Sequence, residues 1–488
     1  MKNHLPGILL SVILAALAGF FDYCLYRSGL LPFRLFILLS VLFVLLVLLA
    51  AVMTWSSQRR VLFVLGVLFS VLLIAGFAFG SHMLTSMIET MGSITSPQTE
   101  RVRMGLFVLN ENPAQSIEDT GDYRFGLLLE TDQESTDAAV EQIEGILGKR
   151  ISSMYYSKLT HLADALLNDE CDAILLNASF LDLISDFDGY GDFRASVREL
   201  STVTVEHIIE PPKTTDPPSG SSQESSDSGV FIMFISGIDT YGDISERSRS
   251  DTNILAVVNP TTRQILLLST PRDYYVPLSM FGGAYDKLTH AGIYGVQCSM
   301  DTLGMLYDTT VDYYFRVNFS GFEQIIDALG GISVYSAYEF TSRHGEYYFS
   351  QGYNDMNGAQ ALGFVRERHS FPDGDNQRGR NQMEVIKAVV KKALSPSILA
   401  TYTDLLNALE GSFSTNMPYD AIAKLIRDQL ADAGKWDLIT YSVTGEGSFR
   451  DTYSASEELY VMIPDYDTVN HAAELIQQMK NGEYISEE

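Results

Sequence analysis

The sequence predicts an α/β protein in which a mixed β-sheet is flanked by helices, preceded by a small α/β domain and three transmembrane helices. Three features lead to this prediction: long apolar runs at the start, apolar strands alternating with amphipathic helices later on, and a Pro-, Ser- and Thr-rich segment between two soluble regions. At 488 residues the chain is too long for one ordinary domain. We therefore expect a membrane part and two soluble domains.

The membrane part is predicted to occupy residues 1–90. The apolar runs at 5–26, 30–53 and 61–80 are each long enough to cross a hydrocarbon core of roughly 30 Å as a helix. The first run has an alternative interpretation as a cleaved signal peptide, because Lys2 precedes it and small residues such as Ala18 and Gly19 offer a cleavage site. Three crossings from an inside start, or two from an outside start, both place the rest of the chain outside the cytoplasm. We expect a multi-pass protein of the cell membrane with extracytoplasmic soluble domains.

The soluble part divides into a small α/β domain at 101–209, a flexible linker at 210–229 and a larger domain at 230–488. Period-two and helical patterns predict a strand at 123–129, a helix at 136–147 and a strand at 173–176 in the first domain. In the second, we expect strands at 230–236, 254–258 and 264–268, the first buried on both faces, and helices at 322–329 and 381–394. The tail after 451 is predicted to form a strand and a helix.

Composition excludes some classes of partner. The formal net charge is −28, so nucleic acid and acidic membrane surfaces are poor bulk partners, and any anion site must be a local concentration of arginine. The cysteines Cys24, Cys171 and Cys298 are scattered, with no C-x-x-C pair, so the fold is not expected to depend on disulfides.

Two aspartates near strand ends are candidate metal ligands. Asp239 follows the strand at 230–236, and Asp251 precedes the strand at 254–258. Side chains at strand ends in an open sheet commonly line a crevice. Two carboxylates there can hold Mg²⁺ or Mn²⁺, which take one or two protein carboxylates plus phosphate oxygens. The alternative is that Asp239 makes a turn and Asp251 caps a strand or pairs with Arg249.

Arginines at element ends or in polar loops form the second candidate constellation. They are Arg249, Arg272, Arg366, Arg368, Arg378 and Arg380. Planar guanidinium groups suit bidentate contact with phosphate, so this pattern favours a pyrophosphate site. If 364–368 is extended, Arg366 and Arg368 share one face. The alternative is a solvated charged edge paired with Glu367 and Asp373.

Seven separated motifs in one order resemble the catalytic domain of the LytR-CpsA-Psr family, over roughly residues 230–394. They are Ile238-Asp239, Arg249-Ser250-Asp251-Thr252, Ser269-Thr270-Pro271-Arg272-Asp273, Lys287-Leu288-Thr289-His290-Ala291, the run from Gly321 to Gly331, Val365-Arg366-Glu367-Arg368, and Asp375-Asn376-Gln377-Arg378-Gly379-Arg380-Asn381-Gln382. The three leading helices and the small domain also resemble the capsule-attaching branch of that family. Tyr241 and Thr289 depart from common family residues, which affects substrate detail more than reaction type.

The resemblance implies a Mg²⁺-assisted phosphotransferase that moves a phospho-glycan, such as capsule or teichoic acid, from a polyprenyl pyrophosphate carrier to a peptidoglycan hydroxyl. It makes Asp239 and Asp251 the metal ligands. It assigns catalysis to Asp251, Arg249, Arg272, Arg366 and Arg368. It assigns substrate binding to Arg249, Arg272, Arg366, Arg368, Arg378 and Gln382.

Phosphoryl transfer by metal and arginine needs no activated Ser or Cys. Asp251 is the first candidate for the general base and Asp273 the second, whereas His290 is expected to orient a loop. An apolar slot for the lipid is predicted from Phe315, Val317, Phe319, Phe322, Ile325, Ile326 and Leu329. Two other functions fit the same residues: a non-catalytic wall-polymer-binding or regulatory membrane protein, and a lipid-pyrophosphate hydrolase with water as acceptor.

Overall fold

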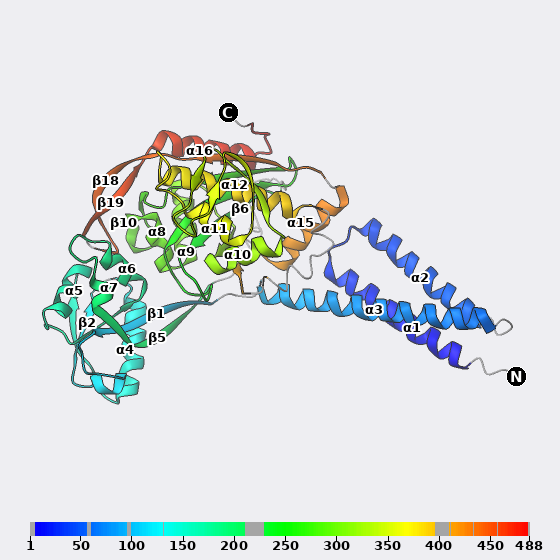
Figure 1. Ribbon diagram of the computed structural model, residues 1–488, viewed down its shortest axis with the longest axis horizontal. Helices are drawn as coiled ribbons and strands as arrows, with labels where there is room; N and C mark the ends of the chain where they lie inside the picture. The colour runs from blue at the N-terminus through cyan, green and yellow to red at the C-terminus, as the bar shows by residue number, and fades with distance from the viewer. Residues whose placement is uncertain are drawn as a thin grey trace, which may run out of the picture. The chain divides into compact units, whose positions relative to one another are not determined.

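The computed structural model describes residues 5–55, 60–94, 99–129, 131–209, 229–395, 409, 411–432, 434–455 and 457–486. The chain forms two compact units (Figure 1). The first comprises residues 1–96, 392–410 and 417–435, and the second comprises 97–391, 411–416 and 436–488. The predicted linker at 210–229 lies outside the described residues except for Gly229.

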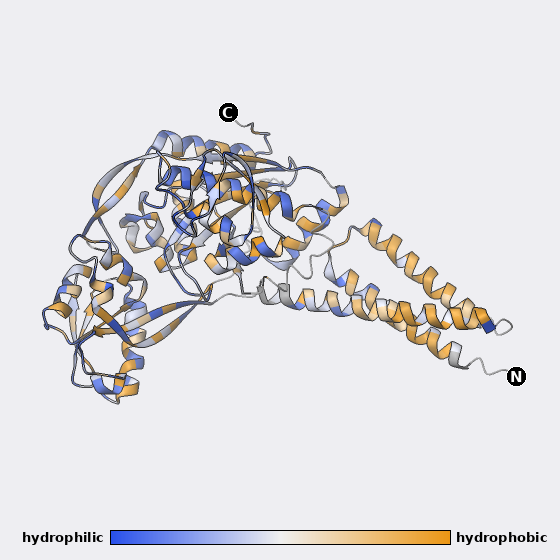
Figure 2. Ribbon diagram, viewed as in Figure 1, coloured by the Kyte–Doolittle hydropathy of each residue, from blue (hydrophilic) through white to orange (hydrophobic). Residues whose placement is uncertain are grey.

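The first unit contains three long apolar helices, α1 (Leu5–Ser28), α2 (Phe33–Trp55) and α3 (Arg60–Ile94). All three are long and apolar enough to cross a membrane, and Figure 2 shows the hydrophobic colour along each of them. A side-chain carbon at Gly66 would lie 2.8 Å from Met53 Cβ, so the glycine lets α3 approach α2 closely. The three predicted apolar helices are present, and the third continues to Ile94, beyond its expected end at Gly80.

Helix α15 (Tyr419–Asp432) belongs to the same unit and contacts the turn between α1 and α2. Tyr419 donates a hydrogen bond to the carbonyl of Ser28 at 2.6 Å, and Arg427 Nη1 donates to that of Gly29 at 3.1 Å. Met87, near the end of α3, is buried with Tyr419 and its neighbours. The α1–α2 turn and the last part of α3 therefore lie at the same end of the helices, as three successive crossings require.

The second unit begins with a five-stranded sheet in the order β3-β2-β4-β1-β5. Its strands are β1 (Thr99–Leu109), β2 (Arg124–Leu128), β3 (Ser152–Tyr156), β4 (Ala173–Asn177) and β5 (Val197–Ile208). Helix α4 (Gln133–Leu147) covers one face, and α5 (Leu159–Leu167) and α6 (Ser179–Ser185) cover the other. Short elements η1 (Ile117–Thr120) and α7 (Phe193–Ser196) complete this small α/β domain, which we call the accessory domain.

A six-stranded mixed sheet, in the order β16-β11-β6-β7-β8-β17, forms the centre of the larger domain. Its strands are β6 (Phe231–Ile238), β7 (Ser250–Asn259), β8 (Gln264–Ser269), β11 (Tyr313–Val317), β16 (Phe413–Thr415) and β17 (Asp437–Ser442). The β6–β11 and β8–β17 pairs are parallel and the others antiparallel. Helices α9 (Val296–Leu306) and α16 (Tyr466–Lys480) bury residues against one face, and α12 (Asp375–Ala393) covers the other.

Smaller elements surround this sheet. They are β9 (Tyr275–Pro277), η2 (Phe281–Gly283), β10 (Tyr285–Lys287), α8 (Leu288–Ala291), η3 (Gly292–Tyr294), α10 (Phe319–Ala328), β12 (Ile332–Ser336), β13 (Phe340–Thr341), β14 (Tyr348–Phe349), β15 (Gly352–Met356), α11 (Gly358–Arg366), β18 (Gly445–Thr452) and β19 (Glu457–Pro464). The strand and helix expected after residue 451 correspond to β19 and α16. All three cysteines are free and buried.

Three local features differ from expectation. Residues 358–366 form helix α11, which a capping box of Asn357 and Gln360 begins, so the condition under which Arg366 and Arg368 would share one face of an extended segment is not met. Helix α12 begins at Asp375, earlier than expected, so the polar sequence before 381 is helical. Strand β6 alternates buried and half-buried residues instead of being buried on both faces.

Candidate active site

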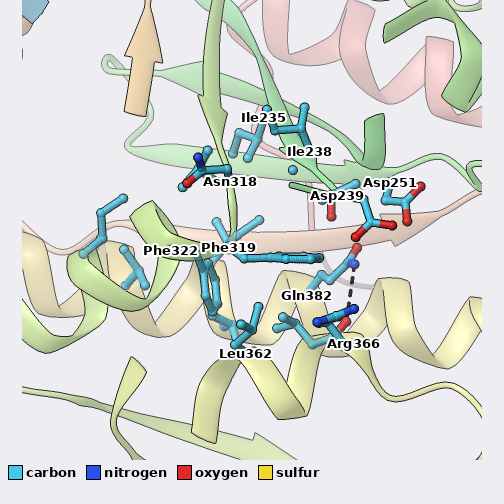
Figure 3. Close-up of a pocket in the computed structure, with 18 of the residues that line it drawn as sticks. Ile235, Ile238, Asp239, Asp251, Asn318, Phe319, Phe322, Leu362, Arg366 and Gln382 are labelled. Carbon is cyan, nitrogen blue, oxygen red and sulfur yellow. Dashed lines mark hydrogen bonds between the residues drawn. The ribbon is translucent and has the colours of Figure 1, made fainter. Parts of the chain in front are cut away.

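The central sheet brings Asp239 and Asp251 together. Strand β6 ends one residue before Asp239, and Asp251 is the second residue of the antiparallel neighbour β7. The end of one strand and the start of the next therefore lie at the same edge of the sheet. Figure 3 shows both carboxyl groups at the polar end of a cavity.

The two carboxyl groups have opposite electrostatic surroundings. Burial and the charge of Asp251 raise the pKa of Asp239, against the opposing charges of Arg249, Arg366 and Arg272. Burial would also raise the pKa of Asp251, but the charges of nearby arginines outweigh it and lower that pKa. Within the described chain, Asp239 makes no ion pair or hydrogen bond through its side chain.

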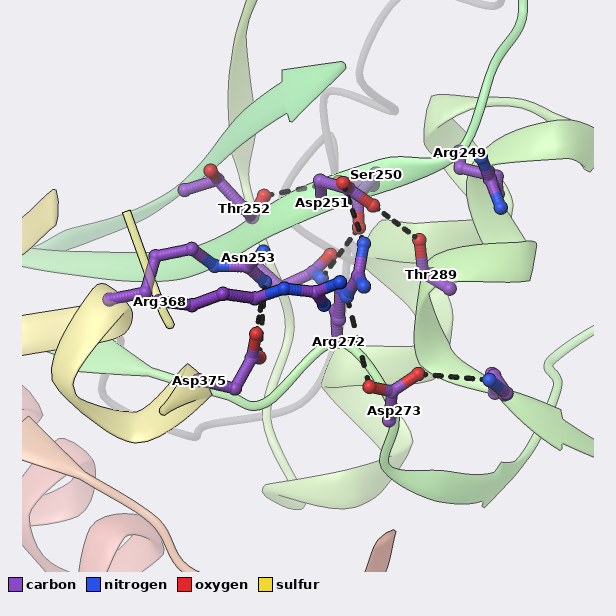
Figure 4. Close-up of polar contacts among 12 residues, drawn as sticks. Arg249, Ser250, Asp251, Thr252, Asn253, Arg272, Asp273, Thr289, Arg368 and Asp375 are labelled. Atoms are coloured by element: carbon purple, nitrogen blue, oxygen red, sulfur yellow. Dashed lines mark hydrogen bonds and ion pairs between the residues drawn. The ribbon is translucent and has the colours of Figure 1, made fainter. Parts of the chain in front are cut away.

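Asp251 is held by two side chains. Arg272 Nη1 lies 2.8 Å from Asp251 Oδ2, and Thr289 Oγ1 donates to Asp251 Oδ1 at 3.2 Å (Figure 4). Thr289, which departs from the common family residue, therefore still supplies a hydrogen bond to the site. The negative charge of Asp251 is compensated, whereas that of Asp239 is not.

Four of the predicted arginines and Gln382 line the polar end of the cavity: Arg272, Arg366, Arg368 and Arg378. Arg272 is paired with Asp251, and Arg378 Nη2 lies 2.9 Å from Asp375 Oδ1. Among the described residues, Arg366 and Arg368 have no carboxylate partner. The Arg366 guanidinium instead stacks over the Phe319 ring, 4.1 Å from its centre. Two guanidinium groups are thus available to an anionic ligand.

Glu367, between these two arginines, holds the loop after α11 in place. Its side chain accepts hydrogen bonds from the backbone N–H groups of Arg343, Arg368, His369 and Ser370 at 2.7–3.0 Å. Burial would raise the pKa of Glu367, but these donors outweigh it and lower the pKa. The sequence offered Glu367 as a surface partner for arginine; it is instead buried and organises the backbone that carries Arg368.

The cavity has a volume of about 430 Å³ and is mostly apolar beyond its charged end. The apolar lining comes from β6, β11, α10, α11 and α12. All residues of the predicted slot line it except Leu329, which is buried elsewhere. Additional lining residues come from α12 and include Val385, Ile386, Val389 and Val390, which the sequence placed only on the predicted helix at 381–394.

Other predicted residues lie outside the cavity. Arg249 does not line it; its Nη1 atom lies 3.1 Å from Asp186 Oδ2 in the accessory domain. Arg380 pairs with Asp373 at 2.6 Å on the surface. Asp273, the second candidate base, pairs with Lys287 Nζ at 3.1 Å and is absent from the lining.

His290, which the sequence analysis expected to orient a loop, is buried and paired outside the cavity. Its Nδ1 atom lies 2.6 Å from Asp286 Oδ1, and both side chains are buried. The backbone N–H of Ser454 donates to the other carboxylate oxygen of Asp286 at 2.8 Å. This buried pair anchors the turn that presents Thr289 to Asp251.

Comparison with known proteins places the chain in a family. A sequence model described as the LytR_cpsA_psr family matches residues 201–471, more than half of the 488 residues. The chain belongs to the LytR-CpsA-Psr family. The family predicted from the sequence is therefore confirmed, and the mixed sheet flanked by helices confirms the predicted fold class. The transferase relatives described next confirm the predicted enzymatic nature.

Similar proteins carry a transferase name. A Bacillus cereus protein named polyisoprenyl-teichoic acid–peptidoglycan teichoic acid transferase TagU is 32% identical over 234 residues, covering 48% of this chain and 75% of that relative. An Enterococcus faecalis protein of the same name is 35% identical over 207 residues, covering 42% and 67%. The crystal structure of B. subtilis TagU shares 26% identity with a TM-score of 0.42, covering 53% of this chain and 99% of that one.

Proposed function

We propose that this family member transfers a phospho-glycan polymer, such as teichoic acid or capsule, from a polyprenyl pyrophosphate carrier to a hydroxyl of peptidoglycan. The observation that carries the proposal is the pair of guanidinium groups without carboxylate partners, Arg366 and Arg368, at the charged end of a mostly apolar cavity. The names of the similar proteins, which are teichoic acid transferases, support it.

The cavity suits both parts of such a donor. A polyprenyl chain is apolar and fits the lining contributed by α10, α11 and α12. The pyrophosphate then lies at the charged end, where Arg366 and Arg368 bind it with planar, bidentate geometry. Arg272 and Arg378, already paired with aspartates, hold the walls around it.

The reaction is a single phosphoryl displacement. The acceptor oxygen attacks the phosphorus that carries the glycan, a new P–O bond forms, and the bond to the bridging oxygen breaks. Polyprenyl phosphate leaves with the electron pair, and the guanidinium groups stabilise the charge on the transferring and leaving oxygens. The hydroxyl proton leaves through a carboxylate at the cavity.

Asp251 remains our candidate to accept that proton, although we assign it only a small part of the rate acceleration. Its lowered pKa makes it a weak base, which suits late proton removal in a largely dissociative transition state. Asp273 is less suited, because Lys287 holds it and it does not line the cavity. Asp251 would mainly orient the attacking hydroxyl.

Asp239 and Asp251 fit a divalent cation such as Mg²⁺ or Mn²⁺. Both offer oxygen ligands at one edge of the sheet, and the raised pKa of Asp239, caused by burial and by the charge of Asp251, indicates uncompensated negative charge. No group of three His, Cys, Asp or Glu suited to metal occurs in the described part of the chain, so phosphate oxygens and water would complete the shell. When bound, the cation neutralises charge on the transferring phosphate.

The reaction defines where the soluble domains must lie. Three apolar helices from an inside start would place everything after α3 outside the cytoplasm, where peptidoglycan is found. A reporter enzyme that is active only in the cytoplasm, fused after Glu488, should be silent in living cells. Strong reporter activity would contradict the proposed site of action.

The reaction itself is tested with the full chain in detergent micelles. It would be incubated with a synthetic polyprenyl pyrophosphate oligosaccharide, with and without Mg²⁺ and with and without a peptidoglycan acceptor, and the products identified by mass. Glycan attached to the acceptor through phosphate is the expected product. Release of glycan phosphate to water alone would identify a lipid-pyrophosphate hydrolase. Binding without product would identify a non-catalytic wall-polymer-binding protein.

A further inference from the structure

A residue of the accessory domain forms an ion pair with Arg249, one of the arginines in the motifs that resemble the family. Asp186 directly follows α6, and its Oδ2 atom lies 3.1 Å from Arg249 Nη1. Arg249 precedes β7 by one residue and Asp251 by two. In Figure 4 the Arg249 side chain lies apart from Arg272 and Arg368.

The residues on either side of Asp186 are buried between the two domains. Its neighbours Ile184 and Phe187 are buried in a core that also contains Ala455 and Leu459, from the β18–β19 region of the larger domain. The accessory domain is thus packed against the larger domain through shared apolar residues. Asp186 lies in the turn directly after α6, and buried side chains on both sides of it fix this turn next to Arg249.

A buried ion cluster and backbone hydrogen bonds also join the accessory domain to the larger domain. Glu100, at the start of β1, is 2% exposed and pairs with Arg316 and with Arg247 Nε, the latter at 3.0 Å. The backbone N–H of Arg101 donates to the carbonyl of Ser245 at 2.8 Å, and that of Arg247 donates to the carbonyl of Arg101 at 2.9 Å. Breaking a buried pair leaves an uncompensated charge, so the two domains resist separation.

Arg249 has a second carboxylate near it. In the antiparallel β6–β7 pair Ile238 lies opposite Ser250, so Asp239 and Arg249 come next on the two strands at the same edge of the sheet. Asp239 has no ion-pair partner among the described residues. An arginine released from Asp186 would be drawn toward that carboxylate. An Arg249–Asp239 ion pair would occupy the oxygen atoms that a divalent cation needs.

We propose that Asp186 is a positioning residue that holds Arg249 away from Asp239 and so keeps this carboxylate available for a divalent cation. The accessory domain thereby takes part in the phosphotransferase site without touching the substrate. This inference rests on the cation site of the proposed function. It assigns to the accessory domain a role that the larger domain cannot supply by itself.

The test measures cation binding directly. Mn²⁺ is titrated into the purified full-length chain in detergent, and the electron paramagnetic resonance signal of free aqueous Mn²⁺ reports binding. Asp186→Asn should weaken Mn²⁺ affinity by about threefold to tenfold, because Arg249 is then free to pair with Asp239. Asp186→Glu, which keeps the carboxylate, should restore affinity close to that of the unmodified protein.

A matched control separates the specific contact from general charge. Asp182 lies on the same helix α6 and pairs with Arg194 inside the accessory domain, so Asp182→Asn removes the same charge without freeing Arg249. We expect it to leave Mn²⁺ affinity unchanged. In an Arg249→Gln background, Asp186→Asn should also have no further effect, because no guanidinium remains to move.

The outcomes are distinguishable. If Asp186→Asn behaves like Asp182→Asn while the unmodified protein binds Mn²⁺, the inference fails and the cation site stands. An equal loss of affinity in the Arg249→Gln background would also overturn the inference, since Asp186 would then act only as a distant charge. If the unmodified protein binds no Mn²⁺, the cation site and the inference fail together. Unchanged thermal unfolding of the variants confirms that each comparison is made on folded protein.

Discussion

The charged end of the cavity has two sides that differ in how their charges are satisfied. On the sheet side, Arg272 and Asp251 form an ion pair, and Thr289 adds a hydrogen bond. On the helix side, at the end of α11, Arg366 and Arg368 have no carboxylate partner in the described chain. The Arg272–Asp251 pair on the sheet side is already complete, and the helix side is open to a ligand.

This difference shows how the site combines stability with binding. Adjacent positive charges without carboxylate partners repel one another, so the helix side costs stability that a bound anion would recover. The geometry is nevertheless fixed, because Phe319 supports the Arg366 guanidinium and Glu367 holds the backbone of Arg368. The sheet side, in contrast, contributes to the stability of the fold itself.

The largest expected effect belongs to the helix side. Replacing Arg366 or Arg368 by Lys keeps the charge but loses the planar bidentate contact. Turnover should fall by about tenfold to a thousandfold, with donor affinity falling less and thermal unfolding unchanged. Steady-state transfer and donor binding at two ionic strengths measure this, with the exposed accessory-domain Arg194→Lys as a control. Unchanged turnover with salt-sensitive binding would indicate a purely electrostatic binder.

The sheet side should respond in both activity and stability. Arg272→Lys is expected to lower turnover within the same range. Arg272→Met should also lower the free energy of unfolding by about 2–3 kcal/mol, because it leaves the mostly buried Asp251 carboxylate without its partner. Arg366→Met should change that free energy by less than about 0.5 kcal/mol. Urea unfolding of both variants tests the contrast, and equal losses would mean that the two sides do not differ as described.

The sequence predicted which residues form the site better than it predicted the ion pairs between them. The placement of Asp239 and Asp251 at strand ends could be predicted because apolar strands are easily recognised and antiparallel neighbours bring such ends together. The arginines were found through family motifs and by the affinity of guanidinium for phosphate. Four of the six now line one cavity.

Which arginine pairs with which aspartate could not be predicted, because these contacts depend on tertiary packing. Asp375 is only three residues from Arg378, but Asp186 is far from Arg249 in the sequence and belongs to another domain. The conformation of 364–368 stayed open because its alternation of apolar and charged residues resembles that of a strand. The capping box at Asn357, which starts the helix, was the signal that was overlooked.

The smallest expected effect concerns the two carboxylates, whose replacement by amides should change stability in opposite directions. Burial would raise the pKa of Asp251, but the charges of Arg272, Arg378 and Arg249 lower it, so the ionised form stabilises the folded state. That contribution is present above the pKa of the unfolded chain, about 3.9, and is lost as the pH falls through the lower folded value. Asp251→Asn should therefore lower the unfolding midpoint at pH 7.

The pKa shift of Asp239, and its effect on stability, have the opposite sign. Burial and the charge of Asp251 raise its pKa, so the folded state binds this proton more tightly than the unfolded chain does. Stability should then decrease as the pH rises from the unfolded value through the raised folded one, and Asp239→Asn should remove that loss. At pH 7 the variant should unfold about 1–3 °C higher than the unmodified protein while transferring far less glycan. Thermal unfolding in the presence of a chelator, from pH 3.5 to 8, measures both signs without interference from bound cations. A lower midpoint for Asp239→Asn at pH 7 would show that Asp239 has a compensating partner. The description of its charge as uncompensated would then be wrong.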